Sequence, residues 1–128
     1  MKGIAVDAAH SAKARKTEYQ GVDLSTGKYL FYKDMGNQTV NIGEFMAIVE
    51  AAKYIVEHNF KPRVIYSDSI TAIGWFKAKE TSSIKKRNKH LMKGVAYLKA
   101  CSSYLDGIEI RHWNSVKWGE NPADFGNK

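Results

Sequence analysis

The spacing of apolar residues along this chain changes between a strand-like and a helix-like period, which predicts an α/β protein. Five short apolar or alternating segments predict strands, and the turn sequence STGK between the second and third predicts a hairpin. The predicted strands cover residues 3–9, 18–24, 28–33, 62–68 and 107–113. Segments with a longer period predict helices at 42–58, 69–79 and 82–105, and the tail at 119–128 predicts a turn with one helical turn.

The order of these elements predicts a mixed sheet. An antiparallel hairpin comes first, and the later strands are joined through helices that cross from one strand to the next. In open α/β sheets, ligands bind beyond the carboxyl ends of the parallel strands. Asp7 and Asp68 each end an apolar strand segment, so we expect both carboxylates at one edge of the sheet if these strands are neighbours.

The helix predicted at 42–58 carries two acids, Glu44 and Glu50, on different faces. Its apolar positions form two adjoining columns: Ile42, Phe45, Met46, Val49, Ala52 and Val56 in one, and Ile48, Ala51 and Ile55 in the other. Glu44 heads the second column, at the border of the buried face, and lies in the first turn, where a carboxylate also suits the helix dipole. Glu50 shares a row with Lys53 and Glu57, which predicts ordinary solvent-exposed charge.

Composition places the chain among compact basic domains. With 128 residues, 44% of them hydrophobic, we expect one domain covering residues 1–128. The lone Cys101 has no internal disulfide partner and the four histidines lack zinc-type spacing, which fits a reducing compartment. There is no apolar run of membrane-spanning length and no evident signal peptide, so we expect a cytoplasmic monomer. The net charge of +7 indicates a polyanionic partner.

The three acids have ordinary structural interpretations when each is taken alone. Glu44 then only marks a helix start, Asp7 bonds to a turn, and Asp68 caps the following helix. Together they indicate more, because carboxylates brought together repel and raise one another's pKa values, and a cation resolves that conflict. Oxygen ligands favour Mg²⁺ or Mn²⁺ over zinc. In a basic protein, such a cluster is typical of two-metal phosphodiester chemistry.

Four segments carry a family resemblance: VDAAHS, NIGEF, IYSDSITAIGW and WGENPADFG, in this order from Val6 to Gly126. Together they resemble type 1 ribonuclease H, and more narrowly a compact bacterial branch of it. The resemblance implies an RNase H-like α/β fold with helices flanking a five-stranded mixed sheet. Its strand order is 3-2-1-4-5, and the first three strands are antiparallel.

The resemblance also implies an activity: an endonuclease that cuts the RNA strand of RNA–DNA hybrids with two Mg²⁺ ions, leaving a 5′-phosphate and a 3′-hydroxyl. Mn²⁺ is the alternative metal. Carried over by motif, the four acids that bind metal and act in catalysis are Asp7, Glu44, Asp68 and Asp124. Asp124 comes from the resemblance alone, because the tail has no periodicity and a solvated terminal acid is its ordinary interpretation.

Positions near the acids are candidates for nucleic-acid contacts. The family's Gly/Asn/Pro-rich turn after the first Asp is replaced here by HSAKARKTEY, whose Lys13, Arg15 and Lys16 suit phosphates. In TVNIGE, Thr39 and Asn41 match phosphate- and minor-groove-contact positions, whereas Val40 breaks the family's asparagine pair. Recognition of a hybrid requires a sensor of 2′-hydroxyls. The candidates are His10, Ser11, Thr39 and Asn41.

The family often places a histidine in a mobile loop before the last Asp, where it assists turnover. His112 is the nearest histidine here and is predicted to end a strand, while ungapped counting from Asp124 points to Asn114, with Lys117 as another candidate. Trp113 and Trp118 are predicted to pack at the sheet edge against the final helix, with stacking on nucleic acid as the less favoured alternative.

A basic stretch lies between Lys77 and Lys93, with seven Lys or Arg residues and one acid. A solvated helix face is the ordinary interpretation. Trp75 and Phe76, just before it, favour a surface that grips a duplex. In the family, a basic protrusion after the third acid holds the DNA strand. The hypothesis is that Trp75, Lys85, Lys86, Arg87 and Lys89 contact the substrate.

Two rival functions remain open. One is a polynucleotidyl transferase or junction nuclease on the same sheet, which usually needs additional DNA-binding elements. The other is a non-catalytic hybrid- or RNA-binding module, and the four intact acids argue against a decayed site of this kind.

Overall fold

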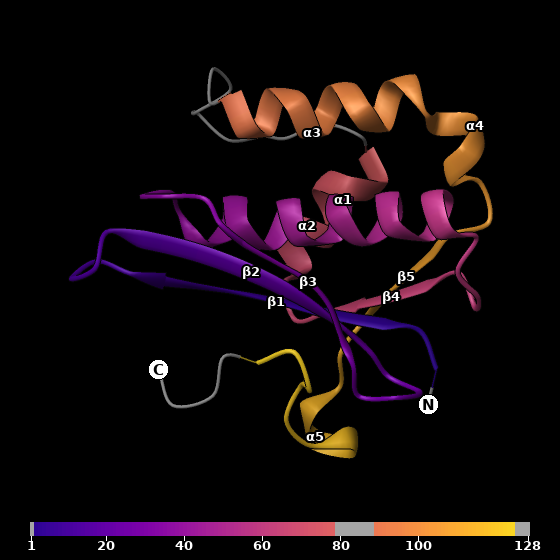
Figure 1. Cartoon of the computed structure of the whole chain (residues 1–128), viewed down its shortest axis with the longest axis horizontal. Coiled ribbons are helices and arrows are strands. Elements are labelled where there is room, and N and C mark those ends of the chain that lie inside the picture. Colours follow the sequence, from indigo (N-terminus) through magenta and orange to yellow (C-terminus); the bar gives the residue numbers. More distant parts are fainter. Residues whose placement is uncertain (1, 79–88, 125–128) are drawn as a thin grey trace.

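The computed structural model describes residues 2–78 and 89–124, and a single five-stranded sheet runs through this part of the chain (Figure 1). The strands are β1 (Ile4–Ser11), β2 (Lys16–Asp23), β3 (Tyr29–Asp34), β4 (Val64–Ser67) and β5 (Glu109–His112). Their order is β3-β2-β1-β4-β5, with β1, β2 and β3 antiparallel and β1, β4 and β5 parallel. This arrangement confirms the predicted mixed sheet and its strand order.

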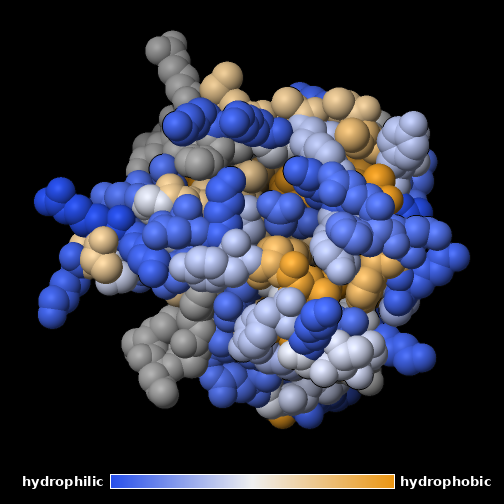
Figure 2. All heavy atoms as spheres, in the orientation of Figure 1, coloured by the Kyte–Doolittle hydropathy of each residue, from blue (hydrophilic) through white to orange (hydrophobic). Residues whose placement is uncertain are grey.

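Helices cover both faces of the sheet unequally. They are α1 (Val40–His58), α2 (Ile70–Ala78), α3 (Lys89–Ala100), α4 (Ser102–Leu105) and α5 (Ser115–Trp118). Figure 1 shows α1 and α3 stacked above the sheet, with the short α5 below it. On the face drawn in Figure 2, hydrophilic side chains cover most of the surface around a small hydrophobic area. None of the helices in the described part of the chain is long and apolar enough to cross a membrane.

The long helix α1 buries the face that its sequence period predicts. Its buried residues include both predicted columns except Met46 and Val56, which are partly buried, and they include Glu44. Thr39 caps its start by accepting a hydrogen bond from the Ile42 amide, 3.4 Å away. Asn59, in the left-handed conformation, ends it.

A glycine allows the start of α1 to lie against the first two strands. A Cβ atom on Gly43 would lie 2.9 Å from Thr17 Cγ2 and 3.0 Å from Ala8 Cβ, closer than side chains tolerate. Both neighbours are buried methyl groups on β2 and β1, so neither moves aside easily. The next residue, Glu44, is therefore held directly over β1.

A small second cluster covers the other face of the sheet. It consists of Ala5, Val22, Tyr66, Trp113 and Ala123. Trp113 lies edge-on to Tyr66 and to Trp118, with ring centroids 5.8 Å and 5.2 Å away. The predicted packing role of the two tryptophans is thus confirmed, although Trp118 stays 41% exposed.

Two predicted helices differ from the structure. The predicted helix at 82–105 is interrupted at Cys101, between α3 and α4, where a run of Cys and Ser residues has low helix propensity. Its beginning, 82–88, lies outside the described residues. For the helical turn expected within 119–128, the described part, 119–124, forms a turn without a helix, and 125–128 lie outside the described residues. A helical turn that was not predicted, α5, comes just before, with Asn114 capping its start and Gly119 its end.

The predicted exposure of Glu50 is wrong. The buried Tyr19 of β2 donates its hydroxyl hydrogen to Glu50 Oε1 at 3.1 Å, so this carboxylate is partly buried against the sheet. Burial, followed by the charge of Glu50, raises the pKa of Tyr19. The other two members of the row lie as predicted, because Lys53 and Glu57 form an exposed ion pair at 4.0 Å.

Replacing Gly43 should test how tightly α1 is pressed onto the sheet. Gly43→Ala should lower the free energy of unfolding by about 1–3 kcal/mol, because the added methyl group has no room. Gly74→Ala in α2 is the matched control: nothing lies within 4 Å of its added Cβ, so it should raise stability by up to about 1 kcal/mol through helix propensity. Urea unfolding of both variants measures the difference, and equal shifts of the same sign would contradict this packing.

Candidate active site

The candidate site lies where two parallel strands separate. β1 and β4 pair only at Ile4–Ile65 and Ala5–Tyr66, after which β1 continues to Ser11 while β4 ends at Ser67. Two backbone groups of β1 just beyond this pairing are bonded by side chains instead. The Ala8 amide donates to Glu44 Oε1 at 2.7 Å, and the Val6 carbonyl accepts from Asn121 Nδ2 at 3.0 Å. At this opening, hydrogen bonds from side chains thus replace those that a neighbouring strand would make.

Glu44 fills this opening from the α1 side. Its side chain is buried, and its second oxygen lies 3.5 Å from the hydroxyl of Ser67, which donates to it. Its buried position confirms the face predicted from helix periodicity. The helix supplies the residue and the free edge of β1 supplies its hydrogen-bond donor.

The carboxyl group of Asp7 lies against that of Glu44. Burial raises the pKa of Glu44 to about 9, and the charge of Asp7 and a hydrogen bond between the two carboxyl groups act in the same direction. Asp68 adds a smaller repulsion, and the amide of Ala8 opposes the shift. Burial and the neighbouring acid therefore favour the protonated form of Glu44, which is hydrogen-bonded to buried Asp7.

Asp68 extends the acid group towards solvent. It follows the last residue of β4 and is exposed. The cap of α2 is made by Ser69, which accepts from the Ala72 amide at 3.1 Å, so the alternative of Asp68 as the helix cap is wrong. Asp68 Oδ2 instead accepts a hydrogen bond from Asn121 Nδ2 at 3.2 Å.

Asp124, at the end of the described chain, shares a hollow with Asp68. The hollow is lined by Asp68, His112, Trp113, Ser115, Glu120, Asn121 and Asp124. The four predicted acids therefore form two linked groups, the buried pair Asp7–Glu44 and the open pair Asp68 and Asp124. Within residues 2–78 and 89–124, no three acid, histidine or cysteine side chains are already spaced to hold a metal ion.

His10 and Thr39 lie at the rim formed by β1 and the start of α1. Buried Thr17 donates its hydroxyl hydrogen to the Gln38 carbonyl at 2.7 Å, so His10 Nδ1, 2.9 Å from the same hydroxyl oxygen, must be the donor. In the neutral ring, His10 Nε2 is then a hydrogen-bond acceptor. Thr39 is occupied as the α1 cap, and Asn41 is exposed in the first turn.

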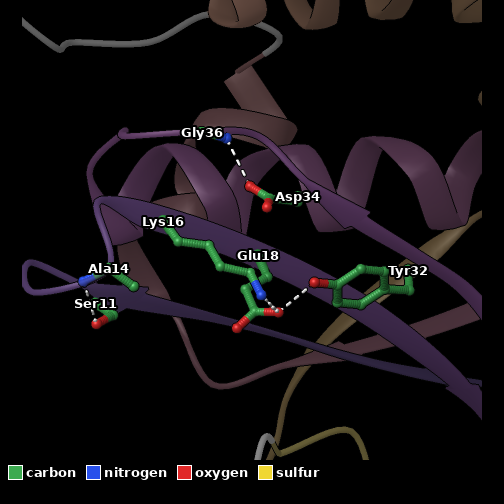
Figure 3. A network of polar contacts seen from close by, with 7 residues as sticks. All are labelled: Ser11, Ala14, Lys16, Glu18, Tyr32, Asp34 and Gly36. Atoms are coloured by element: carbon green, nitrogen blue, oxygen red, sulfur yellow. Dashed lines mark hydrogen bonds and ion pairs between the residues drawn. The ribbon is translucent and has the colours of Figure 1, made fainter.

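The turn between β1 and β2 is tied by its own polar groups (Figure 3). Ser11 Oγ accepts from the Ala14 amide at 3.1 Å, and Lys13 is exposed at the turn. Lys16 pairs with Glu18 at 3.3 Å, and the Tyr32 hydroxyl donates to the same carboxylate. The hydrogen bond to Glu18, ahead of the other contacts, raises the pKa of Lys16.

The remaining predicted contacts fall in three places. Lys85, Lys86 and Arg87 lie outside the described residues, and Lys89 is exposed at the first residue of α3. Trp75 is partly buried and packs edge-on against Phe45, with centroids 5.9 Å apart.

The segment considered for a lid role is a capped helical turn. Asn114 Oδ1 accepts from the Lys117 amide at 3.0 Å, and the Lys117 side chain is exposed. His112 ends β5 as predicted, and its Nε2 lies 3.2 Å from the backbone carbonyl of Asp68.

Periodicity and the acid pattern missed Asn121. Its side chain is buried and bonds three separate parts of the site: the Val6 carbonyl, Asp68 Oδ2 and the Ala123 amide. The dipeptide Asn121–Pro122 was the available signal, because an Asn before Pro is typical of a turn in which the side chain accepts a nearby amide. That signal indicates a turn and says nothing of the two bonds made to distant residues.

No family model matches this chain. Among solved structures, an RNase H1 from the halophilic archaeon Halobacterium salinarum is similar over 91% of this chain and 87% of its own, with a TM-score of 0.64 and 14% identity. An RNase H1 isolated from compost, solved in complex with an RNA/DNA hybrid, is similar over 91% and 88%, with a TM-score of 0.62 and 14% identity. The N-terminal RNase H domain of a Mycobacterium tuberculosis protein is similar over 90% and 89%, with a TM-score of 0.57 and 12% identity. The chain therefore has a type 1 RNase H-like fold.

Proposed function

We propose that this chain is a divalent-metal-dependent ribonuclease H that hydrolyses the RNA strand of RNA–DNA hybrids. The observation that carries the proposal is the buried pair of carboxyl groups, Asp7 and Glu44, at the opening between β1 and β4. Burying a carboxyl group beside a second one costs stability, and a cation reverses that cost. The RNase H-like fold and the hybrid bound by a similar structure support this choice of substrate.

The donor set fits a hard divalent cation. Asp7, Glu44, Asp68 and Asp124 offer only carboxylate oxygens, the ligands that Mg²⁺ and Mn²⁺ prefer. We assign two Mg²⁺ ions to these four acids, with Mn²⁺ as the alternative. Asp68 and Asp124 line the same open hollow, so we assign them the solvent side of the set and the buried pair its inner side.

The bound ions would supply the activation of water and the stabilisation of the leaving oxygen that phosphodiester hydrolysis requires. Glu44 would release its proton to solvent when a cation binds, while the Ala8 amide holds its Oε1 in place. Asp7 is buried on the inner side of the site, where bulk water has little access. Hydrolysis leaves the 5′-phosphate and 3′-hydroxyl ends characteristic of this family.

We assign the recognition of RNA over DNA to the rim beside the acids. His10, Ser11, Thr39 and Asn41 lie around the end of β1 and the start of α1, within the reach of a shallow minor groove. His10 Nε2, as an acceptor, suits the 2′-hydroxyl donor that RNA has and DNA lacks. Phosphate contacts are assigned to the exposed cations Lys13 and Lys89, and to the segment 85–87.

Cleavage assays test the activity directly. With Mg²⁺, the wild type should cut the RNA strand of a labelled hybrid, and Glu44→Gln should lower kcat by at least about 10²–10³-fold because an electrostatic component of the site is removed. Glu57→Gln, an exposed acid of the same helix, should leave kcat unchanged. Hybrid binding without cleavage would instead support a binding module, and cleavage confined to duplex or junction DNA would support a transferase or junction nuclease.

Stability should fall with rising pH when no metal is present. The folded state keeps the Glu44 proton up to about pH 9 whereas the unfolded chain loses it near its ordinary value, so unfolding becomes easier between these pH values, by up to about 1.4 kcal/mol per pH unit. Urea unfolding in chelator at about pH 6 and about pH 8 should show this decline. Glu44→Gln should flatten it and be the more stable protein at the higher pH.

Mg²⁺ should restore the stability of the wild type at the higher pH and have little effect on Glu44→Gln. Glu57→Gln again serves as the control and should follow the wild type. A wild-type decline that Glu44→Gln leaves unchanged would assign the pH dependence to other groups.

The salt dependence of hybrid binding tests the phosphate contacts. Reversing the charge of Lys85, Lys86, Arg87 and Lys89 together should weaken binding and reduce the slope of log affinity against log salt by about one for each phosphate that is no longer neutralised. The matched control reverses four exposed lysines elsewhere: Lys2, Lys28, Lys33 and Lys61. Equal slopes for the two quadruple variants in a binding titration would show that only net charge matters.

A further inference from the structure

We propose that Asn121 is a positioning residue that holds Asp68 in the orientation required for metal binding. The inference rests on the proposed function, since it assigns Asn121 a part in the same site. Asn121 is 5% exposed. Its side chain is not itself one of the candidate metal ligands. Its three hydrogen bonds instead join strand β1, the end of β4 and the tail.

The hydrogen bonds of Asn121 admit one orientation of its amide. Both donor contacts come from Nδ2, to the Val6 carbonyl at 3.0 Å and to Asp68 Oδ2 at 3.2 Å. Its Oδ1 accepts from the Ala123 amide at 2.9 Å. Exchanging the amide oxygen and nitrogen would place an acceptor against two acceptors and a donor against a donor, so none of the three bonds would form.

This geometry ties Asp68 to the strand that carries Asp7. Val6 directly precedes Asp7 on β1, so the amide that bonds the Val6 carbonyl fixes Asp68 relative to the buried pair. The same residue reaches the last acid, because the Asp124 amide donates to the Asn121 carbonyl at 2.9 Å. Asn121 thus sets the relative positions of three acids through one side chain and its own backbone.

A neutral amide suits this task better than a cation. A Lys or Arg in the same place would pair with the Asp68 carboxylate and oppose metal binding, whereas an amide leaves its negative charge intact. The amide bonds the Oδ2 atom of Asp68, so the other carboxylate oxygen can face a cation. Hydrogen bonds of this kind to metal-binding carboxylates raise metal affinity by orienting the ligand.

Gln20 provides a control for simple attachment of the tail. Its Nε2 donates to the Ala123 carbonyl at 2.6 Å from β2, so it fastens the same turn by bonding Ala123 rather than Asp68. If Asn121 mattered only because it anchors the tail, removing the Gln20 side chain would have the same effect on metal binding as removing that of Asn121.

The experiment measures binding of Mn²⁺ alone to the full chain by calorimetry, together with urea unfolding. Asn121→Ala should weaken Mn²⁺ binding by about 10–100-fold. Gln20→Ala should lower stability while leaving Mn²⁺ affinity within about twofold of the wild type. Asn121→Ser, which keeps a single donor, should also weaken Mn²⁺ binding and replaces Asn121→Ala if that variant fails to fold.

Two results would overturn the inference: Mn²⁺ affinity unchanged in both Asn121 variants, or an equally large decrease in Gln20→Ala. These outcomes differ from failure of the proposed function. In that case the wild type itself would bind no Mn²⁺ and leave the hybrid uncut, and the comparison among variants would not arise.

Discussion

The hydrogen bond from the Ala8 amide to Glu44 is the contact on which the rest of the site depends. β1 extends beyond the end of β4 at the carboxyl edge of the sheet. Backbone groups of β1 on that side therefore have no strand to hydrogen-bond with. The buried Glu44 carboxyl group accepts a hydrogen bond from one of these groups, the Ala8 amide. This bond also holds a titratable side chain against the sheet. Gly43 makes the contact geometrically possible, because any larger residue would hold α1 away from β1 and β2.

Much of this arrangement follows from periodicity. Burial imposes a two-residue period on strands and a 3.6-residue period on helices, so the strands, the face of α1 and the direction of Glu44 could be predicted from the sequence. The shared edge of Asp7 and Asp68 followed once β1 and β4 were taken as parallel neighbours, although Asp68 follows the end of β4 whereas Asp7 lies within β1 and not at its end. These features depend on local patterns that each segment carries by itself.

Features that arise between distant segments could not be predicted in this way. Glu50 has the spacing of a surface acid, yet the phenol of Tyr19, a residue of another element, makes it an acceptor inside the fold. Asn121 and Asp124 lie in a non-periodic tail whose position depends on contacts with β1 and β2. Family resemblance predicted Asp124 as a site residue, where periodicity gives no signal, but it did not predict the Asn121 side chain that holds the tail.

The way in which the tail is attached has a thermodynamic consequence. Residues 121–124 lie outside the strands. They are attached to the sheet by hydrogen bonds of the Gln20 and Asn121 side-chain amides and by the buried methyl group of Ala123. Opening this segment breaks fewer contacts than opening a strand, so we expect its local unfolding free energy to be lower than that of the sheet. We therefore expect the outermost acid to open as a separate unit, a motion that leaves Asp7 and Glu44 in place. In hydrogen exchange, the amides of Ala123 and Asp124 report this motion independently of global unfolding.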